Sequence, residues 1–467
     1  MIVDNRSHSH KELRTVEYSG KQWELLRDKL SHRSVGSLCN DNPELLIFPH
    51  CLGERRKEFC DAEICTVVGN TITTGNLMGF IGVENDEHRA ELSIRSRFQQ
   101  DGKEDYFLHY LLEKVFHINL LKLPTSGGDC ETFEFILFHL FTHYLRRSIK
   151  QGIFKQYQKC DYNDANVKGV IDISRHIRYN IPFNGKVAYR TSEYKYDNPV
   201  TQLIRHTIEY IRQHPFAGNV LKEVDDSVRT IYEITPSYNV NHRQSIINKN
   251  LKPIKHPFYT QYTFLQRLCL HILRHKKMSY APSEQKVYGI LFDGAWLWEE
   301  YLATMLVEKG FTHAVKEERN GFQMYAGGQM RYPDFYNVES GIILDAKYKR
   351  LNLGIQRNDL YQMISYIHTL NNGKEFHTPC AKFGALIYPL SFSDSNICNA
   401  ELTFKTLYGS GGKLGVIPLQ IPQCKECYES FVGNMNITEE KLIKDIHKIA
   451  AMTEEQQDCN IDIKIDD

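Results

Sequence analysis

The segment from Arg331 to Lys349 constrains the fold of this chain more than any other stretch. Two short apolar runs lie on either side of a glycine-containing turn at residues 339–341, and this arrangement is typical of a β-hairpin. Asp334 follows a proline and enters the first expected strand, and Asp345 leaves the second. A hairpin with these ends brings the two carboxylates together.

Two converging carboxylates favour a Mg²⁺ site, because a bound divalent ion neutralises a phosphate and activates a water molecule. We therefore predict that Asp334 and Asp345 bind metal, with the backbone carbonyl of Ala346 as a further ligand. Lys347 lies two residues after Asp345, so both side chains share one face of the strand. We expect its ammonium to position the nucleophile or to stabilise charge on the phosphate. The predicted chemistry is metal-dependent hydrolysis of a phosphodiester.

Helices on either side of the hairpin offer supporting side chains. Glu299 or Glu300, of which we favour Glu299, would point at the metal from the preceding helix. Gln362 and Tyr366 share one face of the following helix. Each of these residues also fits an ordinary solvated or boundary face. An Asp-x-Lys triplet likewise occurs in exposed strands as a weak ion pair. Here, however, the second acid follows the apolar run 341–344, and a charge beside a buried strand is costly unless something pairs with it.

The last third of the chain alternates helix and strand, which predicts a mixed sheet covered by helices. We expect helices at 283–308 and 358–370 and strands at 311–315, 330–338, 342–347, 385–388 and 402–407. The predicted fold class is α/β (α+β), with this C-terminal sheet preceded by a mixed β and helical N-terminal region.

The rest of the chain predicts a small sheet within 62–98 and helices at 21–30, 105–121, 133–150, 199–212, 260–275 and 439–451, with a connecting loop at 241–256. The expected domains are a surface extension at 1–60, a β-rich and then helical region at 61–280, a domain that carries the hairpin at 281–430, and a helix with a disordered acidic tail at 431–467. No internal repeat is evident.

The chain has no net charge, with 57 basic and 57 acidic residues, so no overall field would hold it on nucleic acid. Its polar start and the absence of a long apolar run predict a cytoplasmic protein with no membrane partner. A local basic stretch with interleaved tyrosines could face DNA or an acidic partner surface, or could simply be solvated. It comprises Arg175, His176, Arg178, Tyr179, Lys186, Tyr189 and Arg190.

Twelve cysteines are scattered along the chain without a regular framework, which in a reducing compartment predicts mostly free thiols. Only Cys424 and Cys427 have a spacing typical of metal ligands. No second pair follows them, so a zinc site would need distant Cys51, Cys60 or Cys65 to complete it. Free thiols are the simpler interpretation.

Glu299, Asp334, Asp345-x-Lys347 and Gln362-x-x-x-Tyr366, in this order, resemble the PD-(D/E)xK nuclease superfamily and its RecB-like branch. The segments 152–157, 167–177 and 193–203 resemble the region upstream of the nuclease in McrC-type restriction subunits. The N-terminal part, including 74–81, is similar to the LlaJI-type branch of that family. The resemblance covers roughly residues 65 to 420. Residues 1–60 and the tail after about residue 430 lie outside it.

This resemblance implies a Mg²⁺-dependent endonuclease subunit of a GTP-dependent restriction system. It implies that the region 61–280 binds the partner and that 281–430 is the PD-(D/E)xK nuclease domain. Such a subunit docks on a hexameric, McrB-like AAA+ GTPase that recognises DNA, stimulates its GTP hydrolysis, and cuts double-stranded DNA. This chain has no GxxxxGK[ST] phosphate loop, so GTP is expected to bind the partner. Two alternatives stay open: a non-catalytic adaptor that only assembles and activates the GTPase, and a stand-alone repair or recombination nuclease.

Overall fold

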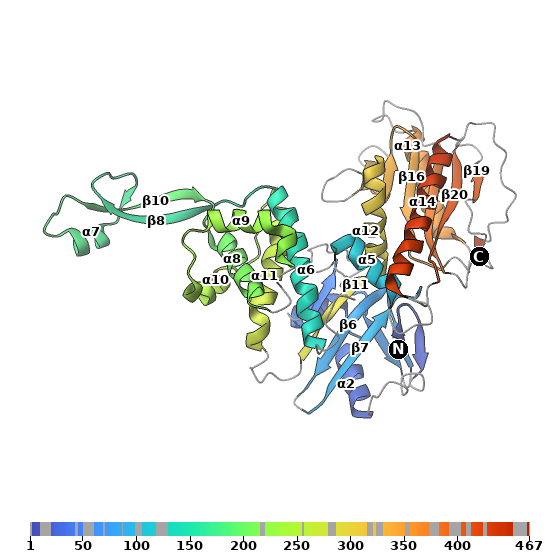
Figure 1. Ribbon diagram of the computed structural model, residues 1–467, viewed down its shortest axis with the longest axis horizontal. Coiled ribbons are helices and arrows are strands. Elements are labelled where there is room, and N and C mark those ends of the chain that lie inside the picture. Colours follow the sequence, from blue (N-terminus) through green and yellow to red (C-terminus); the bar gives the residue numbers. More distant parts are fainter. Residues whose placement is uncertain are drawn as a thin grey trace. The chain divides into compact units, whose positions relative to one another are not determined.

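The computed structural model places the elements as drawn in Figure 1. It describes residues 2–9, 20–42, 45–49, 60–68, 71–85, 87–98, 105–117, 129–214, 220–254, 256–278, 286–314, 321–323, 330–350, 355–372, 383–391, 403–407, 412–423, 427–451 and 465–466. The chain divides into two compact units. Unit 1 contains Met1–His50, Arg55–Asn119 and Gln285–Asp467, and unit 2 contains Cys51–Glu54 and Leu120–Glu284.

Unit 1 contains a five-stranded sheet in the order β1-β7-β6-β11-β3. Its strands are β1 (Ile2–Val3), β3 (Leu45–Phe48), β6 (Leu77–Glu84), β7 (Arg89–Arg95) and β11 (Lys286–Asp293). The inner strand β11 pairs antiparallel with β6 and parallel with β3, although more than 200 residues separate it from either. Gly79 and Gly289 have positive φ angles, and a Cβ on either would lie 2.3 Å from a carbonyl oxygen of the facing strand. Only glycine fits this approach of the two backbones.

The N-terminal part of the chain adds to the core under this sheet. Helix α2 (Gly20–Leu30) and helix α3 (Val35–Asp41) bury their apolar side chains against the strands, in one cluster that includes Trp23, Leu26, Ile47 and Leu291. Strands β2 (Ser7–Ser9), β5 (Thr71–Thr74) and β4 (Cys65–Val68) form a three-stranded sheet, which adds buried side chains to the same cluster. The interpretation of residues 1–60 as a surface extension is therefore wrong for the described residues, because their apolar side chains belong to the core.

The second large sheet of unit 1 has six strands in the order β12-β15-β16-β18-β20-β19. They are β12 (Thr312–His313), β15 (Phe335–Asn337), β16 (Ile342–Ala346), β18 (Phe383–Leu390), β19 (Thr403–Thr406) and β20 (Lys413–Gln420). The central strands β16, β18 and β20 are parallel, and the outer pairs are antiparallel. This mixed sheet with helices confirms the predicted fold class.

Helix α13 (Arg357–Asn372) packs Met363 and Ile367 on the six-stranded sheet, in a core with Ile343 and Leu386. Helices α5 (Tyr106–Phe116), α12 (Gly294–Leu306) and α14 (Tyr428–Ala451) also belong to this unit. Their buried hydroxyls converge on one carboxylate, since Glu439 of α14 accepts hydrogen bonds from Tyr110 at 2.5 Å and from Tyr301 at 2.8 Å. The remaining short elements are the 3₁₀ helix η5 (Val307–Lys309) and the two-stranded ribbons of β13 (Phe322–Gln323) with β14 (Met330–Arg331) and of β17 (Ile355–Gln356) with β21 (Ile465–Asp466).

Unit 2 consists of helices from which an arm extends (Figure 1). The helices are α6 (Asp129–Lys150), α8 (Pro199–Arg212), α9 (Asp225–Ile234), α10 (Arg243–Lys249) and α11 (Thr260–Met278), with 3₁₀ turns η3 (Leu221–Val224) and η4 (Val240–His242). The arm comprises β8 (Gln156–Asp164), β9 (Val170–Ile171), α7 (Ile173–Asn180) and β10 (Val187–Lys195). Asn198 caps α8 and Pro199 occupies its first turn.

Several predicted elements differ from the structure. The helix expected at 283–308 is instead strand β11 followed by α12, because Asp293 caps a helix that begins only at Gly294. The strand expected at 330–338 is interrupted around Pro333, and its ends join different sheets. Helix α10 occupies part of the loop expected at 241–256.

The predicted domain boundaries also differ from the two units. Residues 60–117, so far as they are described, lie in unit 1 rather than with the helices of unit 2, so the expected region 61–280 does not form one body. The described end of the acidic tail, Ile465–Asp466, pairs with β17 rather than being disordered. No helix among the described residues is both long and apolar enough to cross a membrane.

Candidate functional site

The predicted hairpin is confirmed, and it lies inside the six-stranded sheet. Strands β15 and β16 pair antiparallel, with Phe335 opposite Leu344, and β16 continues into the sheet through its parallel partner β18. Gly341 adopts a φ of 67°, a left-handed conformation that glycine adopts without strain. The Asn337 side chain closes the turn by accepting a hydrogen bond from the Ser340 amide at 2.9 Å.

The hairpin brings its two acids to the same end of the sheet. Asp334 immediately precedes β15, and its Oδ2 accepts a hydrogen bond of 2.7 Å from the backbone amide of Ala346 at the end of β16. Asp345, one residue earlier in β16, is buried. Its Oδ2 is paired with the Lys347 ammonium, whereas its Oδ1 is buried and has no hydrogen-bond donor among the described residues.

A chain of hydrogen bonds ties Lys347 to the helix that covers the sheet. The Lys347 ammonium donates to Gln362 Oε1 at 3.1 Å, and the Gln362 amide donates to the Tyr366 hydroxyl at 2.8 Å. That hydroxyl in turn donates to the carbonyl of Tyr332, two residues before Asp334, at 3.2 Å. The predicted face of Gln362 and Tyr366 therefore points at the site.

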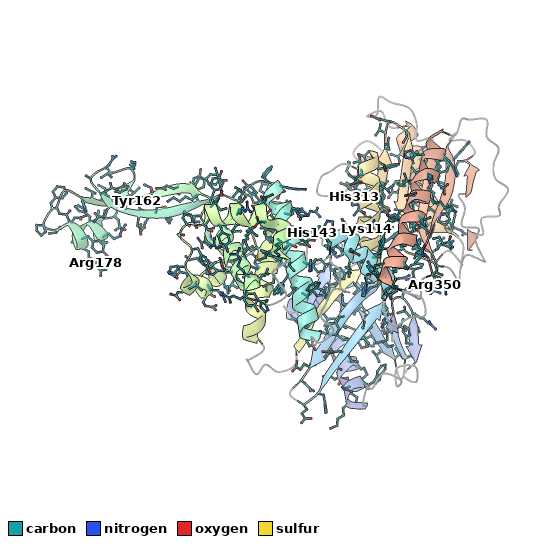
Figure 2. The ribbon with its side chains drawn as sticks, viewed as in Figure 1. Lys114, His143, Tyr162, Arg178, His313 and Arg350 are labelled. Carbon is teal, nitrogen blue, oxygen red and sulfur yellow. The ribbon has the colours of Figure 1, made fainter. Side chains whose placement is uncertain are left out.

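Glu299 of α12 is close enough to the two aspartates for its negative charge to raise the pKa of both. Its carboxylate is 2.9 Å from Nε2 of His313 in β12. The imidazole of His313 stacks on the ring of Phe335, with the centroids 5.1 Å apart. Nothing in the sequence pattern singles out His313, because only the pairing of β12 with β15 brings it here. Figure 2 labels its position.

The electrostatics of the site disfavour two ionised carboxylates. Burial, followed by the charges of Asp345 and Glu299, raises the pKa of Asp334 well above its usual range. Burial also raises the pKa of Asp345, although the Lys347 ammonium acts against it. For Lys347, burial alone would lower the pKa, but the charges of Asp345 and Asp334 outweigh it and hold that pKa above its usual range. A second positive charge would relieve the remaining repulsion.

The residues present fit part of a metal shell. Among the described residues, no three His, Cys, Asp or Glu side chains are close enough to enclose an ion by themselves. Mg²⁺, however, is usually held by one or two carboxylates and keeps several waters or phosphate oxygens. The unpartnered Oδ1 of Asp345 and the carboxylate of Asp334 supply such a set, so the two aspartates fit this ion.

The cysteines add no metal site in the described part of the chain. Cys427 is exposed, with its Sγ 3.2 Å from the Ser430 hydroxyl, whereas Cys424 and Cys51 lie outside the described residues. Cys65 is a free buried thiol, and burial raises its pKa to about 12.

The arm of unit 2 is a second surface of interest, because it exposes many apolar side chains. Around α7 these are Val167, Val170, Ile171, Ile173, Ile177, Tyr179, Ile181 and Phe183. Ile173 and Ile177 lie one turn apart on α7 and are 68% and 55% exposed. Exposed apolar clusters of this kind mark surfaces that bind other macromolecules.

Neighbouring acids neutralise part of the basic stretch predicted on this arm. Arg190 pairs with Asp161 at 2.7 Å and with Asp172 at 3.3 Å, and Arg175 also pairs with Asp161. Tyr189 is buried. Of the stretch, Arg178 and Lys186 project as exposed cations (Figure 2 labels Arg178).

A family model described as "McrBC 5-methylcytosine restriction system component" matches residues 72–389. The match spans more than half of the chain and includes the hairpin, and the chain therefore belongs to this family of restriction-system components. A search of curated proteins found no match to this chain.

Two solved structures, both from Thermococcus gammatolerans, are similar to this chain. One is a half-complex of McrB AAA+ hexamers with bound McrC, at 14% identity and a TM-score of 0.44, covering 95% of this chain and 99% of that chain. The other is a McrBC complex, at 16% identity and a TM-score of 0.30, covering 66% and 86%. The assignment to the family rests on the family model alone.

Proposed function

We propose that this protein is the Mg²⁺-dependent endonuclease subunit of a GTP-dependent McrBC-type or LlaJI-type restriction system. In this role it cuts phosphodiester bonds of double-stranded DNA and stimulates a McrB-like AAA+ GTPase partner, which binds the GTP. Membership of the restriction-system family supports the system, and the hairpin site supports the chemistry. The observation that carries the proposal is the buried Oδ1 of Asp345, which has no donor among the described residues and lies near a second buried carboxylate.

In the proposed site, Asp334 and Asp345 hold the ion, with the Ala346 carbonyl as a further ligand and Glu299 as a supporting acid. When bound, Mg²⁺ would neutralise the scissile phosphate and activate a water molecule. The Lys347 ammonium, steadied by Gln362 at 3.1 Å, is placed to orient the nucleophile or to stabilise charge on the phosphate. Gln362 and Tyr366 keep this lysine directed at the two acids.

The arm supports the partner half of the proposal. It exposes a cluster of apolar side chains around α7, and its Arg175 and Arg190 are paired with acids, so we assign it to a protein surface rather than to a phosphate backbone. The zero net charge agrees with a subunit that a DNA-binding partner recruits. The arm is the surface that we assign to the GTPase.

The deciding experiment is cleavage by the reconstituted complex carrying Asp345→Ala or Lys347→Ala. We expect both variants to lose DNA cleavage and to stimulate GTP hydrolysis as well as the wild type does. Lys21→Ala, which changes an exposed lysine of α2 in unit 1, is the matched control for the lysine and should still cut. Full cleavage by both site variants would instead identify a non-catalytic adaptor. Cleavage by the purified chain without partner or nucleotide would identify a stand-alone nuclease.

A further inference from the structure

The segment Lys347–Arg350, directly after β16, sends its side chains alternately in two directions. Lys347 and Lys349 contact the side of α13, where the Lys349 ammonium lies 2.9 and 2.8 Å from the two carboxylate oxygens of Asp359. Tyr348 and Arg350 contact the segment 96–98, which directly follows β7. The backbone that carries Lys347 is therefore held from both sides.

Tyr348 is fixed by every part of its side chain. Its hydroxyl is 2.8 Å from the Ser96 hydroxyl, its ring meets the ring of Phe98 edge-on at 5.1 Å, and the Arg97 guanidinium lies 4.8 Å from its centroid. Gly294 opens the space for this ring, because a Cβ there would lie 2.5 Å from it. Arg350 adds a hydrogen bond of 2.6 Å to the carbonyl of Arg97.

Buried charges hold the segment 96–98 that receives Tyr348. Asp4, which follows β1, is fully buried and accepts hydrogen bonds from the Arg97 amide at 2.5 Å, from its Nε at 2.9 Å and from its Nη2 at 2.6 Å. Asn76 accepts a further bond from the same guanidinium at 2.5 Å. Asp105 accepts from the Ser96 amide at 2.6 Å. A fully satisfied buried network of this kind is rigid.

We propose that Tyr348 and Arg350 are positioning residues, which fix the Lys347 ammonium against Asp345 by anchoring the next turn of chain on the Asp4–Arg97 pair. This inference rests on the proposed function. An anchor that served only the stability of the fold could lie at any position along this segment. Here the anchor is the adjacent residue, and its side chain leaves the backbone on the side opposite to the lysine.

The test uses Tyr348→Phe, which removes only the hydroxyl, and Arg350→Ala, which changes an exposed side chain and spares the core. In the reconstituted complex we expect each to lower the single-turnover cleavage rate about tenfold, within the range of about a hundredfold that a misplacement of one ångström can cause. GTPase stimulation should not change. Arg27→Ala, an exposed arginine of α2 in the same unit, is the matched control.

A second measurement separates positioning from general loss of structure. The exposure of Lys347 to an amine-labelling reagent is compared with that of the exposed Lys168 by mass spectrometry of the free chain. We expect Lys347, whose side chain is 13% exposed, to become several times more reactive in both variants at unchanged melting temperature. Unchanged reactivity of Lys347 in both variants overturns the proposal, whatever the cleavage rate. Cleavage by Lys347→Ala would overturn the proposed function instead.

Discussion

In the hairpin site, two carboxylates and an ammonium are buried together, whereas on the arm the charges lie in water and the apolar side chains are exposed. Asp345 is 1% exposed, and within the described part of the chain one of its oxygens has no donor. Asp161 on the arm is exposed and pairs with two arginines. The site buries charged side chains that are usually exposed, and the arm exposes apolar side chains that are usually buried. Buried charge without full compensation is suited to chemistry, and exposed apolar surface is suited to recognition.

The comparison is tested most severely by removing one charge from the site. Asp334→Asn keeps an acceptor for the Ala346 amide but abolishes the charge, so cleavage by the complex should fall by about a thousandfold or more. The same change should raise the free energy of unfolding by about 0.5 to 2 kcal/mol, because it relieves repulsion in a buried site. Thermal melting of the metal-free chain measures this gain.

The control for this substitution is Asp161→Asn on the arm, which removes an exposed carboxylate. It should change the melting temperature little, because exposed ion pairs contribute little to stability. A site variant that melts earlier than the wild type would contradict the idea that the acids are kept at the expense of stability.

The arm is tested by giving its apolar face a charge. Ile177→Asp should weaken binding to the GTPase partner about 10- to 100-fold, since burying an isoleucine contributes about 1.5 to 3 kcal/mol. Binding and GTPase stimulation are measured with the purified partner. Val68→Asp makes the same change at an exposed valine of unit 1 and should bind normally. Equal binding by both variants would remove the arm from the partner surface.

Magnesium should stabilise the isolated chain, and the effect should depend on pH. The pKa values of Asp334 and Asp345 are raised, so the folded state holds protons more tightly than the unfolded state. Without metal, their contribution to stability is therefore present below about pH 4 and is lost as the pH rises through the folded values. Mg²⁺ competes with these protons. At about a hundred times its Kd it should add about 2.7 kcal/mol at pH 8 and less at pH 5.

Melting curves with Mg²⁺ and with a chelator measure this difference, and Asp334→Asn should reduce it. The absence of any Mg²⁺-dependent shift at pH 8 would mean that the free chain does not retain the ion.

The smallest expected effect concerns the side chain that steadies Lys347. Gln362→Ala removes a hydrogen bond to an ammonium, so cleavage should fall about tenfold with little change in melting temperature. Gln356→Ala removes a comparable bond of 2.8 Å to Lys349 and should leave cleavage unchanged. Equal rates for the two variants would show that Gln362 is an ordinary boundary residue.

The geometry of the hairpin was largely predictable because its parts are local in sequence. A turn with Gly341, two apolar runs and a spacing of two between Asp345 and Lys347 specify the hairpin and its faces without distant contacts. The helix that carries Gln362 is adjacent in the chain. His313 was missed because a single histidine carries no pattern, and it meets Glu299 only when β12 joins the sheet.

The errors in the fold come from long-range pairing. The sequence predicts a helix at 286–293 because these residues adjoin the apolar stretch that follows. In the structure they instead form the strand that pairs with both β6 and β3. The sequence predicts a surface extension at 1–60 because the strands there are short and contain charged residues. Their partners, β7 and β11, lie far along the chain, and such pairing overrides local preference.

The insertion of unit 2 between Asn119 and Gln285 has a consequence for biosynthesis. On the ribosome, β3 and β6 emerge early, but the strand that joins them is synthesised only after the whole of unit 2. Nascent chains fold domain by domain from the N-terminus, and unpaired strand edges invite aggregation while they wait. Unit 2, including its arm, can therefore fold before unit 1 is complete and before Asp334 and Asp345 are synthesised.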